Sequence, residues 1–374
     1  MSTGADGRLL VLVAAGGTGG HLFPAEALAA ALAERGVRVA LATDSRAARY
    51  GGHFPADAVH VVPSATVRGR DPLSLARTAG TLALGLARAY ALLGRLKPAM
   101  VVGFGGYPTV PPVLAATLRR IPALIHEQNG VMGRANRLLA SRVQVIATGF
   151  AGVTDHDAAL KAKTVCTGNP VRPAVVAAAA VPYDPPSSDG AFRLLVFGGS
   201  QGARVMSEIV PPAVARLEPH LQMRLRIVQQ ARAEDAAHVR GAFMPPLGSQ
   251  PMSPRSSPIF PRVWPRSHLI VSRSGASTVA ELAAIGRPAI LVPLPHALDQ
   301  DQNANAMVLE KAGGAIRLPQ AEFSPDRLAA EIAALAGDPA RLSAMAVAAK
   351  SVGVLDAAGR LADLVLRTAG ARPH

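Results

Sequence analysis

The chain has 374 residues, 49% of them hydrophobic, and a formal net charge of +14. This length fits two domains rather than one, and the apolar fraction excludes a disordered chain. The single cysteine, Cys166, excludes an intramolecular disulfide, and the first apolar run ends in glycines rather than in a signal-peptide cleavage site. We therefore expect a soluble, cytosolic protein with an anionic partner.

Phosphorylated substrates, an acidic membrane surface and nucleic acid all satisfy this charge. Aromatic residues make up only 4% of the chain, so no base-stacking surface is evident. The sequence also has no zinc-type spacing and no RNA-binding signature. We therefore predict no nucleic-acid partner.

Short β-branched segments alternate with alanine-rich helical segments along both halves. The strand candidates are Leu9–Ala15, Val37–Thr43, Met100–Phe104, Ala123–His126, Val143–Thr148, Phe192–Phe197, Leu225–Gln229, Leu269–Ser272 and Ala289–Pro293. This rhythm predicts an α/β fold with parallel sheets covered on both faces. A Pro/Ser/Asp/Gly stretch at 181–192 predicts a linker, with domains over 1–180 and 181–353. We expect two Rossmann-like, doubly wound domains that face each other across a cleft.

The first domain begins with a strand that runs into "AAGGTGGHLFP", residues 14–24. Glycines there allow backbone N–H groups to approach a ligand closely. Pro24 suits the first turn of the helix predicted over 25–36, and a glycine turn before a helix favours anion binding. The alternative is a tight turn with no ligand. Because the Lys-Ser/Thr of a phosphate-loop ATPase is absent, we exclude that class.

Two further glycine turns follow strand candidates, "GFGGYP" at 103–108 and "GGSQGA" at 198–203. The second includes a hydroxyl, Ser200, that suits a phosphate oxygen. Three such turns exceed what one dinucleotide needs, which favours a site that binds more than one ligand.

Several longer motifs occur in a fixed order. They are "GGTGGHLFP", "GFGGYPTVPP", "HEQNGVMGRANRLLA", "TGNPVR", "FGGSQGAR", "SRSGASTVAELAAIGRPAILVPLP" and "DQDQNANA". Together they resemble the MurG family, the bacterial peptidoglycan enzymes that transfer N-acetylglucosamine (GlcNAc) from UDP-GlcNAc to lipid I. The resemblance covers roughly residues 8–350. It implies the glycosyltransferase B architecture, with the lipid acceptor on the N-terminal domain and the nucleotide sugar on the C-terminal one. It also implies that the last helix, about 354–368, crosses back to the first domain.

The resemblance implies attack of the muramyl 4-hydroxyl on the anomeric carbon, with inversion and loss of UDP, forming lipid II. Such a reaction needs a base, and imidazole changes protonation near neutral pH. His21 is the candidate base and Glu127 the alternative base. His21 as a residue that only shapes its turn is the competing interpretation, and we expect His126 to be structural.

The motifs imply the remaining substrate-binding residues. These are Thr18, Gly19 and Gly20 at the diphosphate or sugar, Asn129 at the GlcNAc hydroxyls, Arg172 and Ser200 at the phosphates, Ala276 and its neighbouring N–H groups at the ligand, Glu281 at the ribose, and Asp301 and Gln302 at the sugar. A cap or salt bridge is the alternative for Glu281, and Asp301 stands where many family members have glutamine. No Asp-x-Asp pair ends a strand, so we expect a metal-independent reaction without a cofactor, UDP-GlcNAc being the donor substrate.

Between Arg70 and Lys97 the sequence predicts an amphipathic helix. Leu75, Leu82, Leu86 and Leu93 share one face, and Arg77, Arg88 and Arg95 lie opposite. A packed helix with a solvated basic face is one explanation, and contact between the arginines and anionic inner-leaflet phospholipids is the other. The second explanation predicts peripheral attachment to the cytoplasmic face of the inner membrane. Association with other cell-wall synthesis proteins stays open.

The family pattern breaks between Ala236 and Ala280, where the chain has no Asp or Glu. Residues 244–266 contain seven prolines and the only tryptophan, which excludes the helices that the family has there. Compensating frameshifts and a genuinely divergent loop are the two explanations. Translation of codons 241–267 in the other frames distinguishes them, because only a frameshift restores an acidic, helical stretch.

Three other functions compete with the transferase. A UDP-GlcNAc 2-epimerase shares the architecture but needs different carboxylates near the anomeric carbon. A dinucleotide-dependent oxidoreductase finds its ribose-binding acid in Asp44 but leaves the "HEQN" and "SRSGA" motifs without a role. A non-catalytic nucleotide-sugar-binding protein becomes serious only if the proline-rich segment is genuine.

Overall fold

The computed structural model describes residues 8–16, 19–45, 54–64, 72–199, 202–243, 250–252, 263–295 and 300–370. The chain divides into two compact units. Unit 1 comprises Met1–Arg172 and Leu355–His374, and unit 2 comprises Pro173–Val354. The boundary precedes the one expected from sequence, so the stretch at 181–192 belongs to unit 2. Each unit contains a parallel sheet packed with helices, which confirms the predicted fold class.

The sheet of unit 1 has the strand order β3-β2-β1-β4-β5-β6-β7 among the described residues, and every pairing is parallel. Its strands are β1 (Leu10–Ala14), β2 (Arg38–Thr43), β3 (Ala58–Val61), β4 (Met100–Gly103), β5 (Ala123–Glu127), β6 (Val145–Thr148) and β7 (Thr164–Cys166). The helical segments of unit 1 are α1 (Gly19–Glu34), α2 (Pro72–Leu96), η2 (Tyr107–Thr109), α3 (Val110–Leu118), α4 (Arg134–Ala140), α5 (Ala158–Lys161) and α15 (Ala357–Gly370).

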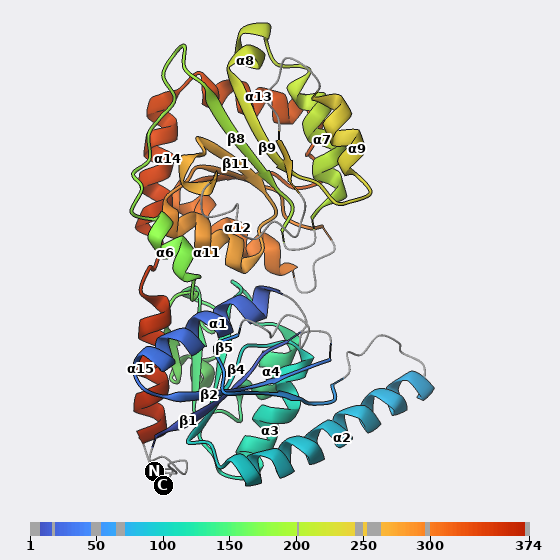
Figure 1. The fold of residues 1–374 in the computed structure, drawn as a ribbon, viewed down its shortest axis with the longest axis vertical. Coiled ribbons are helices and arrows are strands. Elements are labelled where there is room, and N and C mark those ends of the chain that lie inside the picture. The colour runs from blue at the N-terminus through green and yellow to red at the C-terminus, as the bar shows by residue number, and fades with distance from the viewer. Residues whose placement is uncertain are drawn as a thin grey trace. The chain divides into compact units, whose positions relative to one another are not determined.

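Both faces of the unit 1 sheet are buried, which explains why its central strands are almost continuously apolar. Leu10 and Leu12 pack in one core with α2, α3 and α4, whereas Val11 and Val13 pack in another with α1 and α15. The C-terminal α15 lies against α1 in Figure 1. An ion pair joins α15 to the residue that follows α1, with Arg35 Nε 3.0 Å from Asp363 Oδ1.

Unit 2 repeats this plan with the strand order β10-β9-β8-β11-β12-β13 among its described residues. Its strands are β8 (Phe192–Phe197), β9 (Leu225–Gln230), β10 (Gln250–Met252), β11 (Leu269–Ser272), β12 (Ala289–Leu291) and β13 (Ala315–Arg317). Its helical segments are α6 (Pro173–Ala178), α7 (Arg204–Val214), α8 (Pro219–Arg224), α9 (Ala236–Ala242), η3 (Trp264–Arg266), α11 (Ala276–Ile285), α12 (Asp301–Ala312), α13 (Pro325–Ala336) and α14 (Pro339–Ser351).

Helix α1 begins earlier than the sequence indicates. It starts at Gly19, so Pro24 lies inside the helix rather than in its first turn. The missing N–H of Pro24 removes one intrahelical hydrogen bond, but the helix tolerates this loss because its inner face is buried against the sheet. The early start of α1 places His21 in the first turn of the helix.

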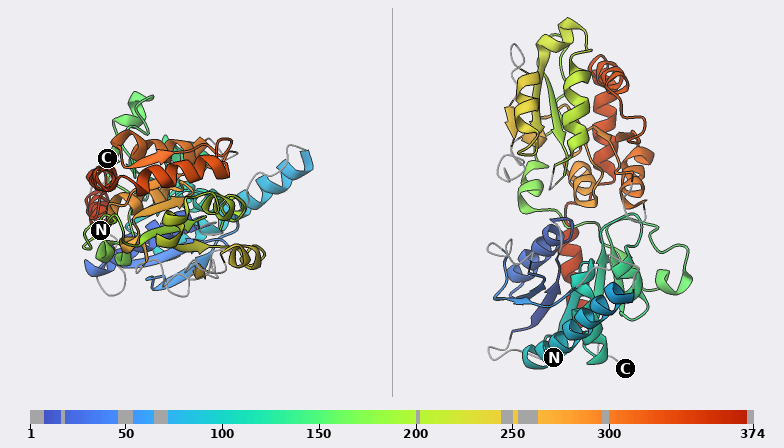
Figure 2. Two further views of the ribbon diagram at one scale, coloured as in Figure 1. Left: turned by 90° about the horizontal axis from the view of Figure 1, so that it is seen from above. Right: turned by 90° about the vertical axis from the view of Figure 1, so that its right-hand side faces the viewer.

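Helix α2 is the longest described helix, and its N-terminal end extends away from the rest of unit 1 (Figures 1 and 2). Leu93 is buried and Leu82 and Leu86 are partly buried, as the predicted apolar face requires, whereas the side chain of Leu75 lies outside the described part. At Gly85 a Cβ atom would lie 2.1 Å from the carbonyl oxygen of Pro63. Only glycine permits this close approach.

Within the proline-rich segment, residues 244–266, the structure describes 250–252 and 263–266. Gln250–Met252 forms β10, a parallel edge strand that pairs with β9, and an edge is where a sheet tolerates proline. Trp264 is buried and its ring meets that of Phe197 edge-on at 5.9 Å. The origin of the segment stays a prediction, since residues 244–249 and 253–262 lie outside the described part.

Candidate active site

A chain of hydrogen bonds connects His21 to the interior of unit 1. His21 Nδ1 lies 3.0 Å from Gln128 Oε1, and Gln128 Nε2 lies 2.9 Å from His126 Nδ1. His126 Nε2 in turn lies 3.1 Å from the carbonyl oxygen of Gly168. Gln128 and His126 are buried, so water does not compete for these contacts. The ring of His21 is therefore anchored on its Nδ1 side.

Glycines flank the opposite edge of the His21 ring. A Cβ atom on Gly106 would lie 3.3 Å from His21 Cδ2 and 3.5 Å from Nε2, and one on Gly105 would lie 3.4 Å from Cε1. Both glycines have positive φ, +83° at Gly105 and +72° at Gly106, a conformation that side chains disfavour. The "GFGGYP" turn thus keeps the Nε2 edge free of side-chain atoms from these two positions.

Glu127 accepts four hydrogen bonds and is buried. Its Oε1 accepts from the backbone N and the Nδ2 of Asn129, each at 3.0 Å. Its Oε2 accepts from Gly133 N at 2.9 Å and from Asn136 Nδ2 at 2.8 Å. Every partner is a donor, so the carboxylate organises the loop between β5 and α4 and orients Asn129.

Two further amides fix this loop. Asn136 Nδ2 also donates to the carbonyl oxygen of His126, at 3.1 Å. Asn169 Nδ2, from the "TGNPVR" motif, donates to the carbonyl oxygen of Gln128 at 2.8 Å. The end of β5 is thus held from both α4 and the segment after β7, which fixes where residues 126–129 lie.

Arg172 lies at the start of the same site. Its guanidinium stacks over the ring of Phe23, 4.8 Å from the centroid, and Phe23 belongs to the first turns of α1. The ring also packs under Gly19, where a Cβ atom would lie 2.9 Å from Phe23 Cε2. A cation is therefore held near the helix N-terminus that includes Gly19, Gly20 and His21, an arrangement that attracts anions.

In unit 2, Gln230 spans the glycine turn that follows β8. Gly198 N donates to Gln230 Oε1 at 2.8 Å, and Gln230 Nε2 donates to the carbonyl oxygen of Gly199 at 3.0 Å. Gly199 has a φ of +90°, which requires glycine in practice. Gln230 therefore fixes Gly198 and Gly199, the described start of this turn.

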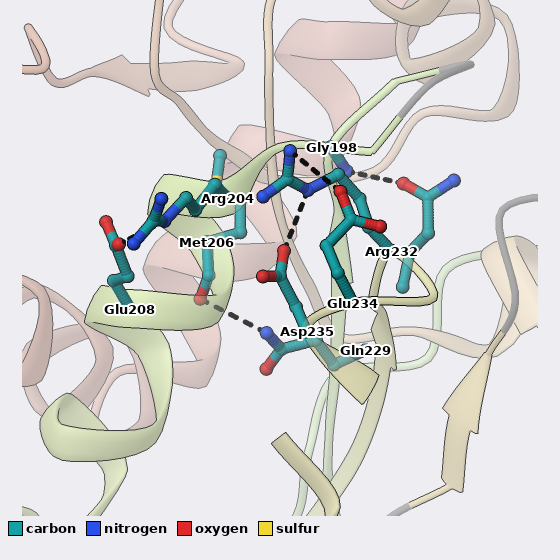
Figure 3. A network of polar contacts seen from close by, with 9 residues as sticks. Gly198, Arg204, Met206, Glu208, Gln229, Arg232, Glu234 and Asp235 are labelled. Atoms are coloured by element: carbon teal, nitrogen blue, oxygen red, sulfur yellow. Dashed lines mark hydrogen bonds and ion pairs between the residues drawn. The ribbon is translucent and has the colours of Figure 1, made fainter. Parts of the chain in front are cut away.

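Charged side chains surround the end of this turn (Figure 3). Arg232 packs on Gly202, where a Cβ atom would lie 2.7 Å from Arg232 Cγ. The same arginine pairs with Asp235 at 2.8 Å and with Glu234 at 3.2 Å, and these ion pairs raise its pKa. In the first turn of α7, Arg204 pairs with Glu208 at 2.6 Å. The turn therefore lies in a strongly polar surrounding.

The two candidate residues of the "SRSGASTVAE" motif lie on α11. Ala276 is its first residue, and Gly275 at the N-cap has no side chain with which to cap the N–H groups. Glu281 lies in the second turn and is buried. A helix N-terminus of this kind suits a phosphate.

Arg273 joins the loop before α11 to the loop after β12. Its Nη1 donates to the carbonyl oxygens of Val292 and Pro293, each at 3.1 Å, and Nη2 donates to Gln320 Oε1 at 2.6 Å. Burial lowers the pKa of this guanidinium. These contacts hold the C-terminal ends of β11 and β12 in one arrangement.

Asp301 and Gln302 form the first turn of α12. Gln302 Oε1 accepts from Leu294 N at 3.1 Å, and the carbonyl oxygen of Gln302 accepts from Ser274 Oγ at 2.8 Å. Asp301 Oδ1 accepts from Gln302 N at 2.7 Å. The structure thus brings this pair beside the turn that starts α11.

Two predicted substrate residues, Thr18 and Ser200, lie outside the described residues. Sequence reasoning did not single out Gln128, Asn136 and Asn169, although each lies in a quoted motif. The alternation of His126 and Gln128 around a buried glutamate was the available signal.

Within the described ranges, no group of three or more His, Cys, Asp or Glu side chains could hold a metal ion, and no single helix is long and apolar enough to cross a membrane.

The buried His126 makes stability depend on pH. Burial lowers its pKa from 6.5 to about 4, against the opposing hydrogen bond to Gly168. Between these values the unfolded chain binds the proton and the folded chain does not, so stability falls as the pH falls. We expect His126→Gln to remove about 2 kcal/mol of the wild-type loss between pH 7.5 and pH 5. Urea unfolding at both pH values measures this difference, and an unchanged pH dependence in the variant would contradict it.

Comparison with known proteins agrees with this description. The glycosyltransferase family 28 N-terminal domain matches residues 11–148, and the C-terminal domain of the same family matches residues 193–361. A UDP-N-acetylglucosamine–N-acetylmuramyl-(pentapeptide) pyrophosphoryl-undecaprenol N-acetylglucosamine transferase of Rhodopseudomonas palustris is 62% identical over 363 residues, covering 96% of this chain and 98% of its own. A protein of the same name from Bradyrhizobium is 59% identical over 364 residues, with the same coverage.

Solved structures give the same result at lower identity. The crystal structure of Acinetobacter baumannii MurG is 28% identical with a TM-score of 0.77, covering 96% of this chain and 100% of that one. A UDP-GlcNAc 2-epimerase of Neisseria meningitidis has a TM-score of 0.65 at 13% identity, covering 96% of this chain and 100% of its own, which shows a shared fold only. The chain belongs to glycosyltransferase family 28, within the MurG group of N-acetylglucosamine transferases.

Proposed function

We propose that the chain transfers GlcNAc from UDP-GlcNAc to the 4-hydroxyl of the muramyl sugar of lipid I, with inversion and with His21 as the base. Relatives about 60% identical over 96% of the chain are named for this transfer. The observation that carries the proposal is the way in which the His21 ring is held. Gln128 holds its Nδ1 side and glycines flank its Nε2 edge, so one nitrogen is positioned to accept a proton.

Glu127 is the weaker candidate for the base. Four N–H groups donate to its two oxygens and occupy the lone pairs that a base would use. We therefore assign Glu127 to positioning Asn129, the residue that the family motif places at the GlcNAc hydroxyls.

The donor binds unit 2 in this proposal. The N-terminus of α11 suits the pyrophosphate, because no side chain caps its backbone N–H groups and these groups stabilise the charge on departing UDP. The family motif adds Ser200, from the glycine turn after β8, at the phosphates. Glu281 suits the ribose hydroxyls, and Asp301 with Gln302 suits the sugar. In unit 1, Arg172 and the α1 N-terminus provide a second anion-binding subsite.

A transfer assay tests the activity. Labelled UDP-GlcNAc is incubated with a lipid I analogue, with and without a chelator. We expect lipid-linked disaccharide in both samples. Recovery of only the 2-epimer of the nucleotide sugar, or of UDP-GlcNAc bound but unchanged, would contradict the proposal and favour an epimerase or a non-catalytic binding protein.

We also propose peripheral attachment to the cytoplasmic face of the inner membrane through α2. Arg77, Arg88 and Arg95 are exposed on one stripe of this helix, and Leu84 lies on the same stripe with 49% of its surface exposed. Basic residues that flank an exposed apolar side chain suit an anionic lipid surface.

Reversal of two of these charges tests the attachment. We expect the double variant Arg88→Glu/Arg95→Glu to bind anionic vesicles at least about tenfold more weakly at low salt, because each basic residue contributes about 1 kcal/mol near such a surface. Vesicle co-sedimentation measures the change, with Arg341→Glu on α14 of unit 2 as the control. Equal binding to neutral vesicles, or no loss in the double variant, would contradict the proposal.

A further inference from the structure

Two backbone carbonyl oxygens, which can only accept, fix the donors and acceptors of the hydrogen-bond chain behind His21. We propose that Gln128 is a positioning residue that holds His21 in the tautomer with the proton on Nδ1, so that Nε2 carries the lone pair that accepts the proton of the acceptor hydroxyl. The proposal rests on the proposed role of His21 as the base. The tautomer itself follows from the geometry alone.

The first fixed group is the carbonyl oxygen of Gly168. A carbonyl only accepts, so His126 Nε2, 3.1 Å away, carries a proton and donates it. His126 is fully buried and stacks beside the Phe104 ring at 5.4 Å, surroundings that keep it neutral. A neutral imidazole has one N–H, so His126 Nδ1 is an acceptor.

The second fixed group is the carbonyl oxygen of His126. Gln128 Nε2 lies 2.8 Å from this oxygen and 2.9 Å from His126 Nδ1, and both of these atoms are acceptors. The nitrogen of the Gln128 amide must therefore face His126, since the reversed amide would place oxygen against two acceptors. The amide oxygen consequently faces His21.

The orientation of the Gln128 amide fixes which nitrogen of His21 carries the proton. Gln128 Oε1 is an acceptor 3.0 Å from His21 Nδ1, so that nitrogen carries the proton and neutral His21 has its lone pair on Nε2. This is the nitrogen at the edge flanked by Gly106. When Nε2 takes the proton of the attacking hydroxyl, Nδ1–H keeps its bond to Gln128, and the bond becomes charge-assisted. Gln128 thus acts as the orienting partner that a catalytic histidine requires.

Nitrogen NMR of the full-length protein tests the tautomer directly. The chain has 10 histidines, and comparison of ¹⁵N-histidine-labelled wild type with His21→Gln identifies the signals of His21. At a pH where His21 is neutral, we expect proton coupling that places the hydrogen on Nδ1. In Gln128→Met, which keeps the volume and removes both polar groups, we expect the Nε2–H form to become populated. A wild-type His21 with its proton on Nε2 overturns the proposal.

Kinetics test the positioning role. We expect Gln128→Met to lower kcat by about 10- to 10³-fold, less than the loss of about 10⁴ seen when a charged orienting group of a catalytic histidine is replaced, with KM for UDP-GlcNAc within about twofold. Gln144→Met is the matched control, since Gln144 bonds the start of β5 through Ala123 N and should leave kcat unchanged.

A double-variant comparison separates positioning from general structure. In a His21→Ala background, Gln128→Met should cause no further loss of kcat, whereas a structural role would slow both backgrounds equally. An equal loss in both backgrounds, or an unchanged kcat in Gln128→Met alone, overturns the positioning role. Full activity of His21→Ala would instead overturn the proposed base and leave the NMR result standing.

Discussion

Replacement of His21 by alanine is expected to lower kcat for GlcNAc transfer by about 10²- to 10⁴-fold, the usual contribution of a general base. The anchored Nδ1 and the glycine-flanked Nε2 edge leave this imidazole positioned for proton transfer. KM for UDP-GlcNAc should change little, because we place most of the donor contacts, those to the ribose and the pyrophosphate among them, on unit 2. Steady-state kinetics with a lipid I analogue measures both constants.

The matched control is His220→Ala, since His220 is an exposed histidine on α8 of unit 2. It should retain wild-type kcat. If His21→Ala keeps kcat within about threefold of wild type, a general-base role worth 10² or more is contradicted, and Glu127 becomes the next candidate to test.

The largest expected loss of stability follows replacement of Arg287 by methionine. This guanidinium is 1% exposed and donates to backbone carbonyls from three segments of unit 2. The accepting residues are Val181, Pro182, Pro265, Ile285 and Gly286. Because a buried carbonyl left without a donor costs about 1–3 kcal/mol, we expect the variant to lose at least about 3 kcal/mol of unfolding free energy.

Urea unfolding of the full chain, monitored through the unit 2 tryptophan, measures this loss. Arg341→Met on α14 is the control, because this exposed arginine should change stability by no more than about 0.5 kcal/mol. A loss of unfolding free energy in Arg287→Met no larger than in the control would contradict this prediction. It would show that the hydrogen bonds from Arg287 do not fix residues 181–182 in unit 2. Burial lowers the pKa of Arg287 while the neighbouring Tyr183 opposes the shift. These carbonyls and the ring of Tyr183, whose centroid lies 5.4 Å away, stabilise the guanidinium charge.

The interior of both sheets was predictable from sequence, and their edges were not. All nine predicted strands occur, whereas the four others in the described residues are β3, β7, β10 and β13, the two edges of each sheet. Most interior strands are buried on both faces and so form apolar runs, although β8 and β9 each include an exposed arginine. The edge strands are short, and β3, β7 and β13 are partly exposed, so their sequences lack that signal.

Two other differences between the predicted and the observed structure arise at proline- and glycine-containing sequences. Pro24 indicated a helix start, but burial of α1 against the sheet let the helix begin at Gly19. The Pro/Ser/Asp/Gly stretch at 181–192 indicated a linker, but Arg287, more than 90 residues away in sequence, bonds its first two carbonyls. No local pattern predicts a contact across that separation.

The candidate site divides in the same way. The motifs identified His21, Glu127 and Asn129 as candidate site residues. The predicted residues Ala276 and Asp301 lie in the first turns of α11 and α12. The roles within the "HEQN" motif depend on tertiary contacts, since the donors to Glu127 come from three separate positions and Gln128 bonds a helix over 100 residues away. Only the folded chain shows which polar group faces which.

The anomeric configuration of the product tests the account most directly. A base on His21 that activates the acceptor hydroxyl produces a single displacement, so the α-configured donor must give a β-linked GlcNAc on the 4-position of the muramyl sugar. NMR of the disaccharide released from the lipid-linked product reports both features. We predict a β(1→4) linkage from the wild type, and an α linkage would contradict the account by requiring a second displacement or a different nucleophile.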